Sequence, residues 1–342
     1  PATVYIAAAS GILIISFASK QALVFLGIVL FILSILYYLS NWINSLHAKH
    51  EKFEEEEGGG RILVTTVNPK TAVGLVKLAA RLAEHQEDTS ICLFSVVKTP
   101  RGASQKTIQE LSTNTETIQN ELLNTTASIA QARNVAIYAK HKPAPNVETG
   151  IFNELKSHNP VQLVLMGWPS TATKITVPHN IIKEVLVMAH KNVGVFRDRG
   201  IDGLKNILVP IGNGPNARLA IKLATDLAFH QDVNVSAIRV VPDEMLQLQE
   251  AIENELGEIP NYIHTSVVSS AEVLEGIVKE VKRTQCDLLI IGAAEEVFSP
   301  HYIFGKLNDA LIEEVDCSIL IVRRFEPGTA LWFRQRIKYI EE

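Results

Sequence analysis

The sequence is poor in cysteine and lacks any cysteine pattern that builds a disulfide framework or a zinc site. Its 342 residues include three cysteines, Cys92, Cys286 and Cys317, with no CxxC pair. An odd number of widely spaced cysteines is typical of buried, reduced thiols in a cytosolic protein. The ten histidines are scattered along the chain. We therefore predict neither disulfides nor a metal site.

The chain also lacks an excess of positive charge and the motifs of the common enzyme classes. Its formal net charge is −5, which argues against a protein that binds nucleic acid by neutralising phosphates. The common hydrolase and metalloprotease classes need their catalytic groups at a fixed spacing. No GxSxG elbow, HExxH pair or paired-carboxylate spacing occurs in the sequence. We predict no nucleic-acid partner, no catalytic residue and no enzymatic activity.

Charge is almost absent from the first 46 residues. Lys20 is the one charged residue between Pro1 and Leu46, and it separates apolar runs of about 19 and about 18 residues, each close to the length of a helix that crosses a bilayer. A secretory signal needs a basic start and a single short apolar core, and neither is present. The pattern predicts a hairpin of two transmembrane helices over 1–46, with the lipid bilayer as its partner.

The predicted hairpin lacks the ionisable groups with which transporters handle a substrate at mid-membrane. Its spans contain no Asp, Glu, His or Arg. Tyr37, Tyr38 and Trp42 are placed to form an interfacial belt where the second span ends. The reduced cysteines downstream favour an exit on the cytosolic side. We interpret the hairpin as an anchor or scaffold.

An acidic, glycine-containing linker follows at 47–60, with four consecutive glutamates and then three glycines. Beyond it, short apolar runs alternate with helical patterns. The predicted strands are at 61–67, 91–97, 135–139, 161–166 and 192–197, and the predicted helices are at 71–85, 104–133, 147–157 and 180–189. This alternation predicts an α/β fold with a doubly wound parallel sheet in a first domain, 61–198.

The soluble part of the chain is an internal duplication. At a shift of 145 positions, Ile62–Val64 matches Ile207–Val209 and Lys77–Ala79 matches Lys222–Ala224. The ends of the two halves also match each other, Val193–Arg197 with Ile319–Arg323. We therefore predict a second doubly wound α/β domain at 199–326, followed by a tail at 327–342.

Glycines mark a loop in the second domain. The apolar run Leu288–Gly292 opens this loop, and Gly305 closes it just before a helical pattern. An apolar strand that ends in glycine and leads to a helix start can deliver a phosphate-sized ligand to that helix. The doubled order of strands and helices, with these glycines, resembles a tandem pair of universal stress protein domains over about 60–325.

The resemblance implies a degenerate nucleotide loop in the second domain. Nucleotide-binding members of that family have glycine, two residues, glycine, nine residues, glycine and then Ser or Thr, because backbone amides cradle the phosphates. Gly292 and Gly305 match this pattern, whereas Glu295 replaces the middle glycine and Lys306 replaces the hydroxyl residue. We predict that Gly292, Gly305 and Lys306 form the site, for ATP or another adenine nucleotide.

The first domain departs further from the family pattern. It retains Gly167, but Ser170 and Asn180 stand at the places of the other glycines. The family's aspartate after the first strand is replaced by Val67 in the first domain and by Gly212 in the second. The second domain is therefore the better candidate for a ligand.

An alternative motif begins at the same Gly212. Gly212–Ala217 fits a dinucleotide fingerprint that follows a strand, with Asp243 beyond the next strand. Pro215, however, also suits a plain helix start. A dinucleotide-binding gate of a potassium-type transporter thus remains an alternative.

The tail at 327–342 combines Leu331, Trp332 and Phe333 with Arg334 and Arg336. Two interpretations are open. The tail is either a helix that caps the edge of the second sheet or an aromatic and basic element that docks on the membrane or on a transport domain.

A transmembrane pair, an acidic linker and tandem stress-protein domains together resemble the carboxyl end of permeases of the amino acid–polyamine–organocation superfamily, which includes amino-acid permeases and cation–chloride cotransporters. The resemblance implies a multi-pass plasma-membrane protein whose transport helices precede Pro1. The soluble domains would then be a cytosolic regulatory module that forms a homodimer. The alternative is a membrane-tethered universal stress protein that senses nucleotide.

Overall fold

A computed structural model describes residue 31 and residues 60–65, 69–86, 88–100, 102–156, 160–168, 177–212, 215–229, 233–242, 262–294 and 302–325. The chain divides into two units, Pro1–Glu57 and Gly58–Glu342, and the fold described below is that of the second. Apart from Phe31 and Gly60, the predicted hairpin and linker lie outside the described residues, as does the tail at 327–342. None of the helices that the structure describes has the length and hydropathy of a bilayer crossing.

Strands and helices alternate in both halves of the second unit, except between β7 and β8, where residues 243–261 lie outside the described part of the chain. In the first repeat the elements are β1 (Arg61–Thr65), α3 (Pro69–Ala83), β2 (Ser90–Lys98), α4 (Gln105–Gln131), β3 (Ala136–Ala144), α5 (Val147–Leu155), β4 (Val161–Gly167), α6 (Val177–Met188) and β5 (Asn192–Arg197). In the second repeat they are β6 (Asn206–Pro210), α7 (Pro215–Ala228), β7 (Asn234–Val241), β8 (Ile263–Ser269), α9 (Val273–Arg283), β9 (Leu288–Gly292), α10 (Lys306–Glu314) and β10 (Ser318–Arg323). The predicted α/β alternation is confirmed.

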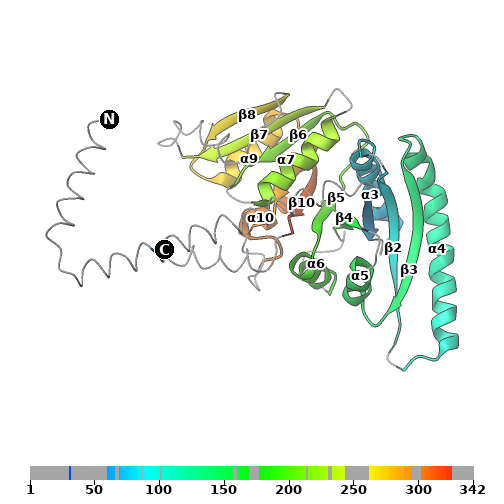
Figure 1. Cartoon of the computed structure of the whole chain (residues 1–342). Helices are drawn as coiled ribbons and strands as arrows, with labels where there is room; N and C mark the ends of the chain where they lie inside the picture. Colours follow the sequence, from blue (N-terminus) through cyan, green and yellow to red (C-terminus); the bar gives the residue numbers. More distant parts are fainter. Residues whose placement is uncertain are drawn as a thin grey trace, which may run out of the picture. The chain divides into compact units, whose positions relative to one another are not determined.

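The described strands form one sheet, in the order β3-β2-β1-β4-β5-β10-β9-β6-β7-β8 (Figure 1). Within each repeat the strands are parallel and follow the same order, from the third strand through the second, first and fourth to the fifth. The two fifth strands, β5 and β10, pair antiparallel, with Phe196 opposite Leu320. The two predicted domains therefore share one sheet and are related by an approximate two-fold axis at this strand pair.

The sequence determines where these elements begin. Pro69 opens α3, where its missing N–H and fixed φ suit the first helical turn. Ser104 caps α4, because its side chain accepts a hydrogen bond of 3.2 Å from the Thr107 amide. The central strands, such as β1 and β9, are buried along their length, as expected for parallel strands with helices on both faces.

β3 is longer than predicted. The prediction ended this strand at residue 139, but the strand continues to Ala144. β3 lies at the edge of the sheet, where one side of the strand needs no hydrogen-bonding partner. An edge strand therefore accommodates Pro143 and charged side chains that a central strand does not.

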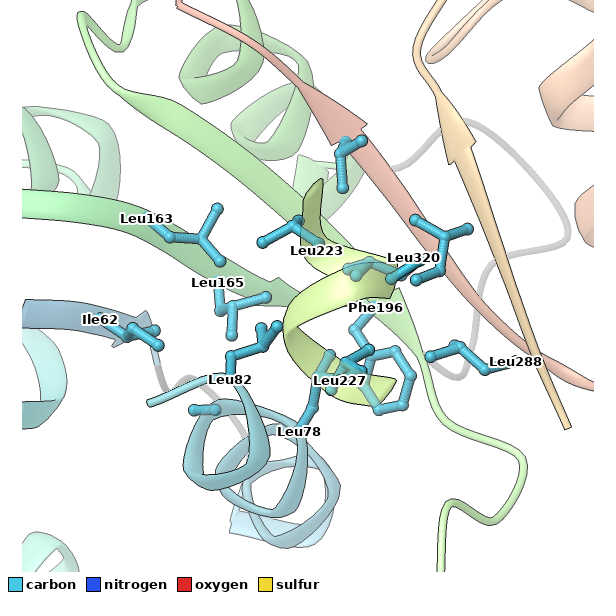
Figure 2. Close-up of a cluster of buried hydrophobic side chains, with 14 of the residues drawn as sticks. Ile62, Leu78, Leu82, Leu163, Leu165, Phe196, Leu223, Leu227, Leu288 and Leu320 are labelled. Atoms are coloured by element: carbon cyan, nitrogen blue, oxygen red, sulfur yellow. The ribbon is translucent and has the colours of Figure 1, made fainter. Parts of the chain in front are cut away.

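Each face of the sheet has a hydrophobic core that runs through both repeats. Helices α3, α4 and α7 cover one face, and α5, α6, α9 and α10 cover the other. Figure 2 shows the centre of the first face, where Leu78 and Leu82 of α3 lie near Leu227 of α7 and Phe196 of β5. All four side chains are at most 6% exposed. The hydrophobic effect that stabilises one repeat thus depends on side chains from the other.

Polar contacts join the same two helices. The Gln86 side chain donates a hydrogen bond of 3.3 Å to Asp226 of α7. The rings of His85 and Phe229 stack at the helix ends, with centroids 3.2 Å apart. His85 has a structural role here, as a contact between repeats.

We expect the two repeats to unfold together because they share a core. Leu82→Ala removes a fully buried side chain and should lower the free energy of unfolding by about 2–5 kcal/mol. The control is Ile118→Ala on α4, where the side chain is 53% exposed. This variant should change the free energy of unfolding by no more than about 0.5 kcal/mol. Urea unfolding of a chain carrying Trp42→Phe and Trp332→Phe, followed by Trp168 fluorescence and by far-UV circular dichroism, measures both effects. Separate transitions for the two signals would contradict a shared core.

Candidate functional site

The predicted nucleotide loop of the second repeat begins at the carboxyl end of β9 and returns at the start of α10. β9 is buried until it reaches Gly292. Gly305 precedes the first residue of α10 and has φ +106° and ψ 156°, a conformation that L side chains rarely adopt. A glycine is therefore required at 305 by the backbone of the loop itself. Lys306 is exposed at the start of the helix.

Gly292 is required by close packing against α7. A Cβ atom at this position would lie 2.7 Å from Asn216 Cβ and 3.0 Å from the Asn216 carbonyl carbon. Real side chains do not approach this closely, so a larger residue would push the start of α7 away from β9. The corresponding Gly167 has more room, because its nearest neighbours, Leu75 and Thr71, would lie 3.3 Å from a Cβ.

Two asparagines hold the ends of the loop. Asn216 donates a hydrogen bond of 2.7 Å to the Ala293 carbonyl oxygen and accepts one of 2.8 Å from the Arg324 amide. Asn308 of α10 donates a hydrogen bond of 2.9 Å to the carbonyl oxygen of Gly292. The two ends of the loop are thus fixed to α7 and α10 by side chains of the chain itself.

Four backbone amides of the loop have partners within the protein. The Ala293 amide donates to the Val322 carbonyl oxygen at 2.8 Å, and the Ala294 amide donates to the Phe304 carbonyl oxygen at 3.0 Å. The amides of Ile303 and Phe304 both donate to the carboxylate of Asp309, at 2.8 and 3.0 Å. Asp309 is thus an internal anion at the place where the family resemblance implies bound phosphate.

The first repeat also supports this loop. Lys183 of α6 donates a hydrogen bond of 2.7 Å to the Tyr302 carbonyl oxygen. The rings of Trp168, which follows β4, and Phe304 lie with centroids 5.4 Å apart. The loop of the second repeat is therefore connected to the end of β4 and to α6, so a change in either repeat can reach it.

The structure brings Gly292 and Gly305 to one site and places Lys306 at its exposed side. Glu295 lies outside the described residues, so the middle of the loop is not part of this geometry. In the first repeat, Asn180 is an exposed residue of α6, and Ser170 lies outside the described residues. Three residues of the alternative dinucleotide motif, Asn213, Gly214 and Asp243, also lie outside the described residues. Nucleotide binding stays a prediction.

The first repeat contains a buried charge cluster that no sequence pattern predicts. Glu154 of α5 is fully buried and forms ion pairs with Arg61 at 2.7 Å, Lys140 at 2.8 Å and Lys142 at 2.7 Å. Arg61 is itself 2% exposed and also donates to the Tyr138 hydroxyl at 3.3 Å. These residues come from β1, β3 and α5, which is why no local motif reveals them.

The cluster changes the acidity of its carboxyl group. Burial alone would raise the pKa of Glu154, but hydrogen bonds from Lys140, Lys142 and Arg61 outweigh burial and lower this pKa below its ordinary value. The folded state therefore gains stability above the ordinary pKa of a glutamate, and loses it as the pH falls through the lowered pKa.

Among its described residues, the second repeat has no such cluster. Glu280 of α9 is the counterpart of Glu154, since Gly150 and Gly276 pack alike against Val96 and Val240. Glu280 pairs with Arg283 of the same helix, at 2.7 Å, and that arginine is 63% exposed. The buried charge cluster is thus specific to the first repeat rather than a requirement of the fold.

Comparisons with known proteins support the fold. A scan against protein-family models finds no match, and a search of the curated proteins finds none either. Among solved structures, a universal stress protein from Archaeoglobus fulgidus DSM 4304 matches with a TM-score of 0.55 and 14% identity, over 76% of this chain and 97% of that chain. The chain therefore has an α/β fold with a mainly parallel sheet that resembles universal stress protein domains.

The cytoplasmic domain of a prokaryotic cation chloride cotransporter matches with a TM-score of 0.53 and 15% identity, over 80% of this chain and 99% of that chain. A universal stress protein solved in complex with cAMP covers 36% of this chain at 13% identity and a TM-score of 0.30, which is too distant to carry an argument about ligands here. The structural neighbours thus include both stress proteins and the soluble part of a transporter.

Replacing the buried glutamate tests the charge cluster. Glu154→Gln leaves Arg61 buried without its anionic partner, and should lower the free energy of unfolding by about 3–5 kcal/mol. The matched control Glu280→Gln leaves an exposed arginine that water can solvate, and should cost about 1 kcal/mol. Urea unfolding at neutral pH measures both. As the pH falls through the lowered pKa, the difference between wild type and Glu154→Gln should shrink. Equal costs for the two variants would contradict the cluster's role.

Removing the internal anion tests the loop. Asp309→Ala takes the acceptor away from the Ile303 and Phe304 amides, so the free energy of unfolding should fall by about 1.5–3 kcal/mol. The control is Asp316→Ala, because the Asp316 side chain is 98% exposed and its pair with Arg199 is worth less than about 1 kcal/mol. Chemical unfolding and hydrogen exchange at Ile303 and Phe304 report the result. Unchanged protection of these two amides would refute the proposed role of Asp309.

Proposed function

We propose that this chain is the carboxyl-terminal part of a multi-pass plasma-membrane transporter, similar to amino-acid permeases of the amino acid–polyamine–organocation superfamily. The two transmembrane helices predicted over 1–46 anchor it in the bilayer. The sheet unit in 58–342 is a cytosolic regulatory module that carries no catalysis. Substrate and coupling ion belong to transport helices that precede Pro1.

The observation that carries this proposal is the match to the cytoplasmic domain of a cation chloride cotransporter, which extends over 99% of that domain. The match covers the tandem arrangement and not only one repeat. The sequence supplies the other support, since two uncharged runs of membrane-spanning length precede the linker.

The geometry suits a regulatory module that acts as one body. The repeats share a sheet and both of its cores, so a change at one end is not absorbed by a hinge between them. The loop of the second repeat also contacts α6 of the first. A ligand or partner would shift the transport equilibrium only by binding two states of this unit with different affinity.

Homodimerisation through the soluble module is part of the proposal. The edges of β5 and β10 are occupied by each other within one chain, so a second copy has to use other surfaces. At β3, Pro143 and the lysines weaken pairing with a further strand, which leaves the helical faces and the β8 side for a partner.

The alternative function is a membrane-tethered nucleotide sensor. Gly292 and Gly305 favour it, because they keep the loop close to α7 and α10 as a phosphate-binding loop requires. The internal bonds of the loop amides, with Asp309 as the anion, weigh against it.

Membrane fractionation tests the proposal directly. The full 342-residue chain should sediment with membranes and resist carbonate extraction, whereas residues 58–342 alone should stay in the supernatant. Release of the full chain from membranes by carbonate would contradict the transporter proposal.

Thermal unfolding separates the two functions, because a ligand that binds only the native state must raise stability. An upward shift with ATP that is lost in Gly305→Ala favours the sensor. No shift with ATP, together with further hydrophobic segments encoded upstream, favours the transporter.

A further inference from the structure

A cavity lies at the end of β9 and β10 opposite the glycine loop. Its volume is about 390 Å³. The residues that line it come from the segments just before these two strands, from α9 and from the turn after β5, and they include both Cys286 and Cys317. Two of the three cysteines of the chain thus meet at one cavity, although they are far apart in the sequence.

The topology of the sheet brings the two cysteines together. Cys286 follows α9 and stands just before β9, and Cys317 stands just before β10. The two strands are parallel neighbours, with Leu288 opposite Ser318, and the Ser318 amide donates to the Asp287 carbonyl oxygen at 3.1 Å. The residues that enter neighbouring parallel strands therefore lie side by side.

The thiols of this pair interact with each other. The neighbouring Cys317 and burial both raise the pKa of Cys286. Cys286 in turn lowers the pKa of Cys317, because it stabilises the Cys317 thiolate. Arg199, at the same cavity, also favours the Cys317 thiolate. A lowered pKa favours the nucleophilic thiolate form of Cys317, which stands beside a second thiol that can resolve it.

The pair is not a requirement of the fold. In the first repeat, β4 and β5 pair with Leu163 opposite Asn192, just as Leu288 lies opposite Ser318. Val161 and Lys191 therefore occupy the places of Cys286 and Cys317. Cys92, the remaining cysteine, is fully buried in the first repeat. The first repeat thus has the same arrangement at the start of its fourth and fifth strands without thiols.

We propose that Cys286 and Cys317 are a redox modification site, at which a small peroxide such as hydrogen peroxide converts the dithiol to a disulfide. The Cys317 thiolate attacks one peroxide oxygen, the O–O bond breaks, and hydroxide leaves while Cys317 becomes a sulfenic acid. The Cys286 sulfur then attacks the Cys317 sulfur, and the S–O bond breaks. The thiol proton and the sulfenic hydroxyl leave as water. Two electrons pass from the two sulfurs to the peroxide.

The cavity and the position of the pair give this reaction an effect. Cys286 and Cys317 are 8% and 9% exposed, so the cavity is the route by which a small oxidant reaches them. The disulfide closes a covalent ring around β9, the glycine loop and α10, and thereby restrains the segment that contacts α6. A regulatory effect of this disulfide rests on the proposed function, whereas the oxidation of the two thiols does not.

The test uses the full chain carrying Cys92→Ser, in which the pair supplies the only thiols. Hydrogen peroxide should remove both thiols titratable after denaturation and lower the mass by two hydrogen atoms, with no dimer on a non-reducing gel. Dithiothreitol should restore both thiols. Persistence of the two thiols, or intermolecular dimers, would overturn the proposal.

Single variants in the same background separate the two roles. With Cys286→Ser, Cys317 has no resolving thiol and should accumulate a sulfenic acid that dimedone traps. With Cys317→Ser, Cys286 should react with neither peroxide nor dimedone at a comparable rate. Equal dimedone labelling of both variants would contradict the assignment of Cys317 as the nucleophile. Circular dichroism of each variant checks that the fold persists.

An arsenical probe tests the proximity of the thiols without oxidation. Phenylarsine oxide condenses with two neighbouring thiols and releases water, so it should bind the Cys92→Ser chain at least tenfold more tightly than either single variant. Equal binding to all three chains would show that the two sulfurs do not reach each other. It would overturn the redox proposal whether or not the proposed transporter function holds.

Discussion

The antiparallel pairing of β5 with β10 is the constraint on which the rest of the structure depends. It joins Val193–Arg197 to Ile319–Arg323 residue by residue and turns two parallel sheets into one. Because each of these strands is an edge strand of its own repeat, the pairing removes an edge that would otherwise be open to other chains. It also places α3 beside α7, so that the hydrophobic core becomes continuous across the two-fold axis.

The two repeats share a backbone fold but have different side-chain chemistry. The first buries Glu154 among cations, where the second has a pair within one helix. The second has the loop closed by Asp309 and the thiol pair at the opposite end of the same strands. Duplication followed by divergence explains this, since the two repeats keep one backbone fold while single positions have changed, including buried ones such as Glu154 and Cys286. The second repeat thus carries both the glycine loop and the thiol pair.

The sequence predicted the alternation of strands and helices, because buried parallel strands and amphipathic helices have distinct periods. It also showed the duplication, through apolar matches such as Ile62–Val64 with Ile207–Val209. It did not show which strands pair across the repeats, since a run that is buried on both faces has the same composition whatever its neighbour. Likewise, β3 was predicted too short, because an edge strand accepts Lys140 and Pro143.

For the site, the glycine pattern predicted a loop that begins at Gly292 and ends at Gly305, but it did not reveal that Asp309 accepts hydrogen bonds from two amides of this loop. Glu154 and its cations were missed, because their partners come from three separate elements. The thiol pair was predicted as isolated buried thiols, since Cys286 and Cys317 form no local motif. The signal that could have found them is their position immediately before two strands that are neighbours in every doubly wound sheet of this order.

Native-state hydrogen exchange tests most directly whether the two repeats are one unit. If the β5–β10 pairing joins them, the amides of Asn192–Arg197 and Ser318–Arg323 that lie between the strands should exchange only by global unfolding, with the same free energy of opening as the amides of β1 and β6. Exchange of these amides at a clearly lower free energy, while β1 and β6 stay protected, would mean that the repeats separate in the native state and would contradict the account.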